Sequence, residues 1–154
     1  MLTQTENKPR VAVHLRVTTC EQLSEPLTAI YCRTAMQSEE AIAAQKDLLM
    51  RYAEENGFVP CAVFIDDGES GATINRPALQ EMLSGIKSGH IKRVLISDFS
   101  RLCREYLLTG KLLAFFGKHG VELIAVKDGF NSRDADTVNS MFTMTGLISE
   151  THGK

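Results

Sequence analysis

The chain has 154 residues, of which 44% are hydrophobic and 23% are charged, and its formal net charge is −2 at pH 7. This composition is typical of one soluble globular domain and excludes a disordered chain, and no apolar run approaches the ~20 residues of a membrane-spanning helix. The net negative charge argues against a free-standing nucleic-acid-binding protein, because such proteins bind largely by neutralising phosphates.

Residues 1–27 are predicted to form an N-terminal leader with a possible extra strand. The leader begins MLTQTENKPR, which lacks the apolar region of a secretory signal, so we expect a cytoplasmic protein. Residues 11–22 read like an earlier copy of residues 29–40, because each has a short apolar run followed by an arginine and a polar turn. Only the second copy leads directly into a helical pattern. We therefore expect residues 11–17 to form an added strand or arm.

Residues 28–133 are predicted to form one α/β core. Apolar, β-branched runs alternate here with stretches of helical periodicity, which indicates a mostly parallel sheet of four to five strands flanked by helices. The expected strands are 27–33, 61–66, 93–97 and 121–126.

The expected helices have recognisable ends. Ser38 is placed to cap the first helix, which Gly57 ends. Pro77 opens the second helix at its preferred first position, and Gly89 closes it. The third helix follows the strand 93–97 and runs up to Gly120.

Residues 134–154 are predicted to be the start of a longer C-terminal helix. Their apolar residues recur at helical spacing, at Val138, Met141, Phe142, Thr145 and Ile148. No capping residue precedes the end of the chain, which suggests a helix that is cut short. Because an apolar helical face at a chain end needs a partner, we expect a homodimer or tetramer that assembles through this helix.

Four arginines follow predicted strands. In an open α/β sheet, ligands bind at the carboxyl ends of the strands, so these side chains are expected to converge on one crevice. Guanidinium groups match phosphate oxygens, so the cluster predicts a phosphate or other oxyanion site. The alternative is that each arginine is a surface residue or pairs with a nearby carboxylate. The four residues are Arg33, Arg76, Arg101 and Arg104.

A metal-dependent phosphoryl-transfer domain is a second possibility. Asp66, Asp67 and Asp98 follow strands, and carboxylates at strand ends are ligands that Mg²⁺ prefers. Against this, arginines outnumber the carboxylates there, and no phosphate-cradling GxxxxGK loop is present. The four cysteines form no CxxC pair, so zinc is not expected. We expect no cofactor.

The order of several short motifs resembles that of serine recombinases, the resolvase and invertase family. The motifs are AIYCRTA, Gln45 within AAQKDLL, DDGESG with Arg76 six residues after Ser70, SRLCR, and GVELIAVKDGF, and they run from about residue 28 to the end. In this family a serine hydroxyl attacks a DNA phosphodiester and forms a phosphoserine link. The cut strands are then exchanged and rejoined.

The resemblance implies a role for each matching residue. The four arginines correspond to those that hold the scissile phosphate and stabilise charge on it. Asp67 and Ser70 correspond to the family's DGxSG loop, and Gln45 corresponds to a glutamine beside the active site. The expected partner is DNA, and the expected activity is site-specific DNA cleavage and strand exchange.

The chain departs from the family at the nucleophile. The attacking serine lies two residues after the first arginine, where this chain has Ala35. Loss of a nucleophile costs about 10⁶ in kcat in a well-studied protease, so strand cleavage is expected to be impaired. Thr18, Ser38 and Ser70 are possible substitutes, although each has an ordinary role in a turn, helix cap or loop. Whether the chain is an enzyme, or a cleavage-deficient module that assembles or binds DNA, stays open.

Overall fold

The computed structural model describes residues 10–14, 27–58 and 61–134. The predicted leader outside residues 10–14, Thr18, and the predicted helix after Asp134 lie outside the described residues. Within the described part of the chain, none of the helices is both long enough and apolar enough to span a membrane.

A six-stranded sheet forms the centre of the fold, in the order β1-β3-β2-β4-β5-β6. Strands β2 to β5 are parallel, and the two edge strands pair antiparallel with their neighbours. The mostly parallel α/β fold expected from the sequence is therefore confirmed. The strands are β1 (Arg10–His14), β2 (Leu27–Thr34), β3 (Cys61–Asp67), β4 (Ile91–Ile96), β5 (Glu122–Ala125) and β6 (Phe130–Asn131).

The sheet has six strands where four to five were expected, and the additional strands lie at its two edges. Residues 11–17 were expected to form a strand or arm, and Arg10–His14 is indeed a strand that pairs with β3. The two-residue β6 was not expected, because a strand of this length has no apolar run that could reveal it.

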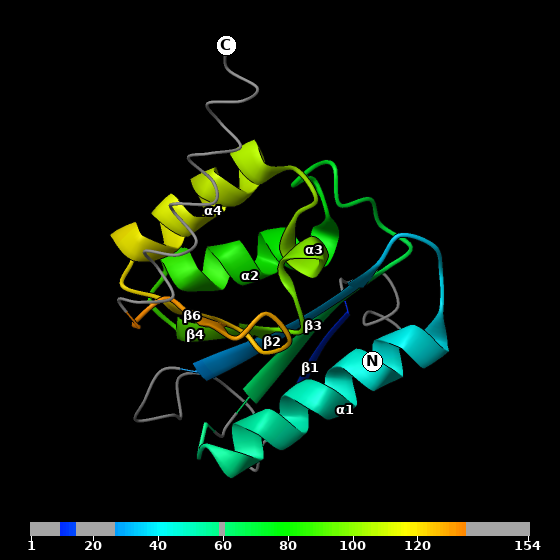
Figure 1. Ribbon diagram of the computed structural model, residues 1–154, viewed down its shortest axis with the longest axis horizontal. Coiled ribbons are helices and arrows are strands. Elements are labelled where there is room, and N and C mark those ends of the chain that lie inside the picture. Colours follow the sequence, from blue (N-terminus) through cyan, green and yellow to red (C-terminus); the bar gives the residue numbers. More distant parts are fainter. Residues whose placement is uncertain (1–9, 15–26, 59–60, 135–154) are drawn as a thin grey trace, which may run out of the picture.

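Helices cover both faces of the sheet (Figure 1). α1 packs on one face, where Leu49 and Ala53 contact apolar side chains of the sheet. α2 and α4 pack on the other face, where Met82 and Phe116 are fully buried. The helices are α1 (Glu39–Glu55), α2 (Pro77–Lys87), α3 (Phe99–Leu102) and α4 (Tyr106–Lys118).

Local sequence signals set the helix ends as predicted. The Ser38 hydroxyl accepts a hydrogen bond from the backbone N–H of Ala41 at 3.2 Å, which caps α1. Pro77 is the first residue of α2. The region expected to be one helix after β4 is divided into α3, a single turn, and α4. This division positions two of the candidate site arginines.

Candidate active site

The carboxyl ends of β2, β3 and β4 lie together at one end of the sheet. Arg33 near the end of β2 is level with Asp66 of β3, and Thr34 is level with Asp67. α3 follows β4 directly and contacts β2. Residues that are far apart in the sequence therefore meet at this end, as the strand order predicts.

Arg33 is completely buried and is surrounded by backbone carbonyls. Its Nε donates to the carbonyl of Arg101 at 2.9 Å, its Nη1 to Glu69 at 2.7 Å, and its Nη2 to Ser100 at 2.6 Å. Every nitrogen of the guanidinium thus has an oxygen partner. The side chain joins the end of β2 to the loop after β3 and to α3.

The surroundings of Arg33 are strongly positive. Burial lowers the pKa of its guanidinium below the ordinary value, and the charges of Arg76, Arg104 and Arg101 lower that pKa further. The four predicted arginines are therefore close enough to act on one another electrostatically. Such a concentration of positive charge favours an anion.

Arg76 is also completely buried. Its Nε donates to the carbonyl of Thr73 at 2.8 Å, and its Nη1 donates to the Tyr31 hydroxyl at 2.8 Å and to the carbonyl of Arg101 at 3.2 Å. Its Nη2 donates to the carbonyl of Leu102. Arg76 therefore holds the same short segment of backbone as Arg33 does.

The Tyr31 hydroxyl links Arg76 to Asp66. It donates to Oδ2 of Asp66 at 2.7 Å, and burial raises the pKa of the tyrosine well above its ordinary value. Asp66 also accepts from the backbone N–H groups of Ala78 and Leu79, each at 2.9 Å, which satisfies the free amides at the start of α2. The Asp66 carboxylate therefore binds the start of α2 and, through the Tyr31 hydroxyl, helps to position Arg76.

Arg101 and Arg104 lie nearer to the surface than the other pair. Arg101 Nη1 donates to the carbonyl of Arg33 at 3.3 Å, and Arg101 Nε lies 3.6 Å from Oδ2 of Asp98. This Nε is buried and has no hydrogen-bond partner. Among the described residues, the exposed guanidinium of Arg104 makes no hydrogen bond or ion pair. This pair has donors available for an anion.

Gln45 and Asp67 hold the backbone on either side of the nucleophile position. Gln45 accepts from the N–H of Arg33 at 3.0 Å and donates to its carbonyl at 2.9 Å. Asp67 Oδ1 accepts from the Thr34 hydroxyl at 2.5 Å and from the N–H of Ser38 at 2.9 Å. The turn between Thr34 and Ser38 is therefore fixed at both ends, and its Ala35 is exposed to solvent.

Comparison with known proteins identifies the family. Residues 28–154 match the family model described as Resolvase, N terminal domain. The chain belongs to this resolvase family. It carries the catalytic-type domain of a site-specific recombinase.

Solved structures of similar fold agree with this assignment. The N-terminal catalytic domain of TP901-1 integrase superposes with a TM-score of 0.71 and 29% identity, covering 80% of this chain and 94% of that one. A resolvase family site-specific recombinase from Streptococcus pneumoniae has a TM-score of 0.68 and 25% identity, covering 82% and 89%.

A curated relative comes from a bacteriophage. Uncharacterized immunity region protein 3 of Bacillus phage phi105 is 34% identical over 85 residues, which are 54% of this chain and 88% of that protein.

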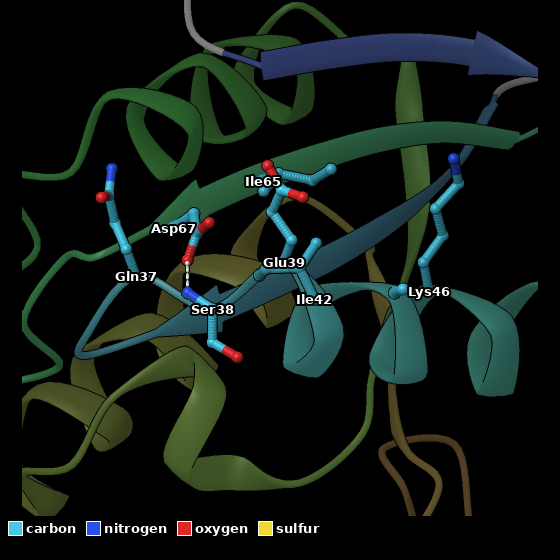
Figure 2. Close-up of a pocket in the computed structure, with 8 residues that line it drawn as sticks. Gln37, Ser38, Glu39, Ile42, Lys46, Ile65 and Asp67 are labelled. Atoms are coloured by element: carbon cyan, nitrogen blue, oxygen red, sulfur yellow. Dashed lines mark hydrogen bonds between the residues drawn. The ribbon is translucent and has the colours of Figure 1, made fainter.

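A pocket of about 480 Å³ lies beside the resolvase-type site (Figure 2). It is formed by the first turns of α1 and the end of β3, with Ser38 and Asp67 joined by a hydrogen bond at one side and Lys46 at the other. None of the four site arginines lines this pocket. The arginine cluster and the pocket are therefore separate features, lined by different residues.

The carboxylates proposed as metal ligands have other roles in this resolvase-family domain. Asp66 caps α2, and Asp98 accepts from the Ser100 amide and hydroxyl at the start of α3. The described residues contain no group of three or more histidine, cysteine or acidic side chains that could hold a metal ion. The geometry gives the metal-dependent alternative no support.

Sequence reasoning missed Tyr31 and Gly71 as parts of the site. A hydroxyl in an otherwise apolar buried strand was the available signal for Tyr31, because a buried tyrosine hydroxyl requires a partner. Gly71 follows Ser70 in the DDGESG motif, but its contacts with two arginine side chains could not be inferred from the motif alone.

Proposed function

We propose that this domain binds DNA phosphates as a recombinase does, but that Ala35 impairs cleavage of the strand. The observation that carries this proposal is the exposed methyl group of Ala35 at the end of β2, in a turn that Gln45 and Asp67 hold on both sides. The arginine cluster beside it supports phosphate binding. The relatives described as a catalytic domain of an integrase and as a site-specific recombinase support DNA as the partner.

The missing step is the nucleophilic attack. In the family reaction, the serine oxygen forms a bond to phosphorus while the bond from phosphorus to the 3′ oxygen breaks. The serine loses its proton, and the 3′ oxygen gains one. Alanine has no oxygen for this bond, so cleavage is expected to fall by a factor on the order of 10⁶.

Nearby hydroxyl groups are poor substitutes. Ser38 accepts a hydrogen bond as the cap of α1, and Ser70 accepts one from the N–H of Ala72 at 3.0 Å. The Thr34 hydroxyl donates to Asp67. Each of these groups has a structural partner, which favours a cleavage-deficient domain. Thr18 stays a candidate from sequence alone.

We also propose that copies of the domain associate as a dimer or tetramer through residues 134–154, and that the protein acts in the cytoplasm. A cleavage-deficient copy would then retain two properties of an active recombinase, which are DNA binding and assembly. In this proposal Asp67, Ser70, Gln45 and the four arginines keep the roles that the family resemblance implies.

Restoring the hydroxyl tests the proposal directly. The Ala35→Ser variant and the parent chain are incubated with a radiolabelled pool of random-sequence duplexes, and covalent adducts are separated on a denaturing gel. We expect an adduct only with Ala35→Ser, because the arginines and the loop containing Asp67 already surround that position. Phosphoserine at residue 35 is then identified by mass spectrometry.

Ala35→Gly is the matched control, because it also alters the turn but adds no hydroxyl. An adduct formed by the parent chain and abolished by Ser38→Ala or Thr18→Ala would show that a different hydroxyl is the nucleophile. An Ala35→Ser chain that binds DNA and assembles, yet forms no adduct, would favour a domain that only binds and assembles.

A further inference from the structure

β1 lies outside the part of the chain that matches the resolvase family. The family match begins at residue 28, whereas β1 covers Arg10–His14. β1 pairs antiparallel with β3, so it runs in the opposite direction to the parallel strands β2 to β5. The chain therefore enters β1 near the carboxyl end of β3, which is the end where the candidate active site lies. The residues that come directly before β1 start from this end of the sheet.

β3 continues past its last pairing with β1. Arg10 is level with Ile65, but β3 extends to Asp67. The described part of the chain places no strand opposite Asp67 on this outer side of β3. Continuing the same antiparallel register by two residues places Lys8 opposite Asp67. Pro9 between them suits an edge strand, because proline has no N–H group to pair.

This register directs Lys8 to the pocket between β3 and α1. Side chains two residues apart on a strand lie on the same face of the sheet, and both Ile65 and Asp67 line the pocket (Figure 2). Residues directly opposite each other in an antiparallel pair also share a face. A lysine opposite Asp67 therefore projects on the face of the sheet that forms the pocket.

The charges of the pocket favour a positive side chain. Its lining includes the carboxylates of Asp67 and Glu39 but only one ammonium group, that of Lys46. Ile42 and Ile65 supply apolar surface. The stem of a lysine can lie on such surface while its ammonium group reaches a carboxylate. Opposite charges on directly opposed residues also stabilise a strand pair.

We propose that residues 8 and 9 extend β1 along β3 and that Lys8 occupies the pocket, with its ammonium group between the carboxylates of Asp67 and Glu39. Asp67 accepts hydrogen bonds from the Thr34 hydroxyl and from the N–H of Ser38. A cation beside this carboxylate holds it in place, so Lys8 is a positioning residue for the turn between Thr34 and Ser38. This contact requires no DNA, so it stands apart from the proposed DNA function.

Zero-length cross-linking tests the position of Lys8 in the full chain. A water-soluble carbodiimide joins a lysine amine to a carboxylate where the two groups form an ion pair, and the linked peptides are identified by mass spectrometry. We expect links from Lys8 to Asp67 and to Glu39. Glu40 is the matched control, because it is exposed in the same turn of α1 but does not line the pocket. Lys8→Arg removes the reactive amine and is expected to give no link.

A mixture of ¹⁴N and ¹⁵N chains separates links within one chain from links between two chains. Links of Lys8 to Asp67 or Glu39 within one chain would support the proposal. Links between chains would assign the pocket to the leader of a second copy and would overturn it. Links made mainly to Glu40, or no link from Lys8, would overturn it as well.

Hydrogen exchange of the Ser38 amide tests the positioning role. This amide donates to Asp67 at 2.9 Å, so it exchanges with solvent when that bond opens. Lys8→Gln is expected to speed its exchange by roughly two- to fivefold, the factor that a cross-strand charge pair supports. Lys8→Arg keeps the charge and is expected to keep the parent rate. Lys111→Gln removes an exposed lysine of α4, on the opposite face of the sheet, and is expected to change nothing.

The amide of Leu95, in the buried strand β4, shows whether the whole domain opens more often. Faster exchange of the Ser38 amide in Lys8→Gln, without faster exchange at Leu95, would support the positioning role. Equal acceleration at the two amides would show an effect on overall stability and would overturn that role. An unchanged rate at Ser38, or equal acceleration there in Lys111→Gln, would also overturn it.

Discussion

Gly71 lies at the point where the loop after β3 meets the backbone that follows α3. Its carbonyl accepts from the N–H of Arg104 at 2.9 Å. A Cβ atom at this position would lie 2.7 Å from Nη2 of Arg33 and 2.9 Å from Cγ of Arg104. Arg104 can move because it is exposed, but the three hydrogen bonds of Arg33 hold its guanidinium in place. Packing around Arg33 therefore requires a residue without a side chain at position 71.

We expect Gly71→Ala to destabilise the domain by about 1–3 kcal/mol, because the added methyl group forces the buried Arg33 out of position. The free energy of unfolding from urea titration measures this loss. Gly110→Ala is the matched control, since Gly110 lies within α4 and a Cβ there has nothing within 4 Å. That substitution is expected to stabilise the domain by about 0.5–1 kcal/mol. Equal effects at the two glycines would contradict the packing argument.

For single residues, the sequence predicted the position in the fold better than the direction in which the side chain points. Ser38 was correctly expected to cap a helix, because a capping signal depends only on neighbouring residues. Arg33 lies near the end of β2 and Arg76 at the start of α2, and the side chains of both donate to backbone carbonyls of α3. The orientation of a side chain depends on the tertiary contacts of several segments, which no local pattern contains. The catalytic roles of these residues stay predictions.

The helix α3 depends on Asp98 at its start. Oδ1 of Asp98 accepts from the N–H of Ser100 at 3.1 Å, and Oδ2 lies near Arg101. Burial alone would raise the pKa of this carboxyl group, but hydrogen bonds from Ser100 and Ser97 and the charge of Arg101 outweigh burial and lower it. The folded state therefore favours the ionised form.

We expect the contribution of Asp98 to stability to depend on pH. A lowered pKa in the folded state gives stability that is present above the ordinary carboxyl pKa of about 3.9 and is lost as the pH falls through the folded value. Asp98→Asn keeps a capping side chain but removes the charge. The difference in unfolding free energy between parent and variant is expected to be largest near pH 7 and to shrink below about pH 4. Urea titrations at several pH values measure it, and a difference that does not change with pH would count against this account.

Among the elements, long periodic segments were predicted well and short ones were missed. The residues of α1 and α2 agree with the expected helices because their apolar spacing and end signals extend over several turns. The division between α3 and α4 was not expected. It occurs at Cys103 and Arg104, where the chain leaves the helical conformation and the N–H of Arg104 bonds to Gly71. That contact joins segments distant in sequence.

For the molecule as a whole, the proposed association depends on residues 134–154. We expect sedimentation velocity of the full chain to show a larger species as its concentration rises, because the apolar residues of this segment recur at helical spacing. Phe142→Asp and Ile148→Asp are expected to reduce association by placing a charge on that face. Thr143→Asp, on the opposite face of the predicted helix, is the control. Equal loss of association in all three variants would reject the proposed interface.

The position of β2 in the middle of the sheet also has a consequence for how quickly the chain reaches this fold. Its neighbours are β3 on one side and β4 on the other, and Thr28, Ala29 and Ile30 are each paired with a residue of both strands. To form either pairing, the chain must close a loop of tens of residues. This closure lowers the conformational entropy of the chain, which opposes the pairing. Contacts between residues so distant in sequence are associated with slow folding. The topology that gathers the site at one end of the sheet is therefore expected to make folding slow, because the central strand pairs only with segments far along the chain.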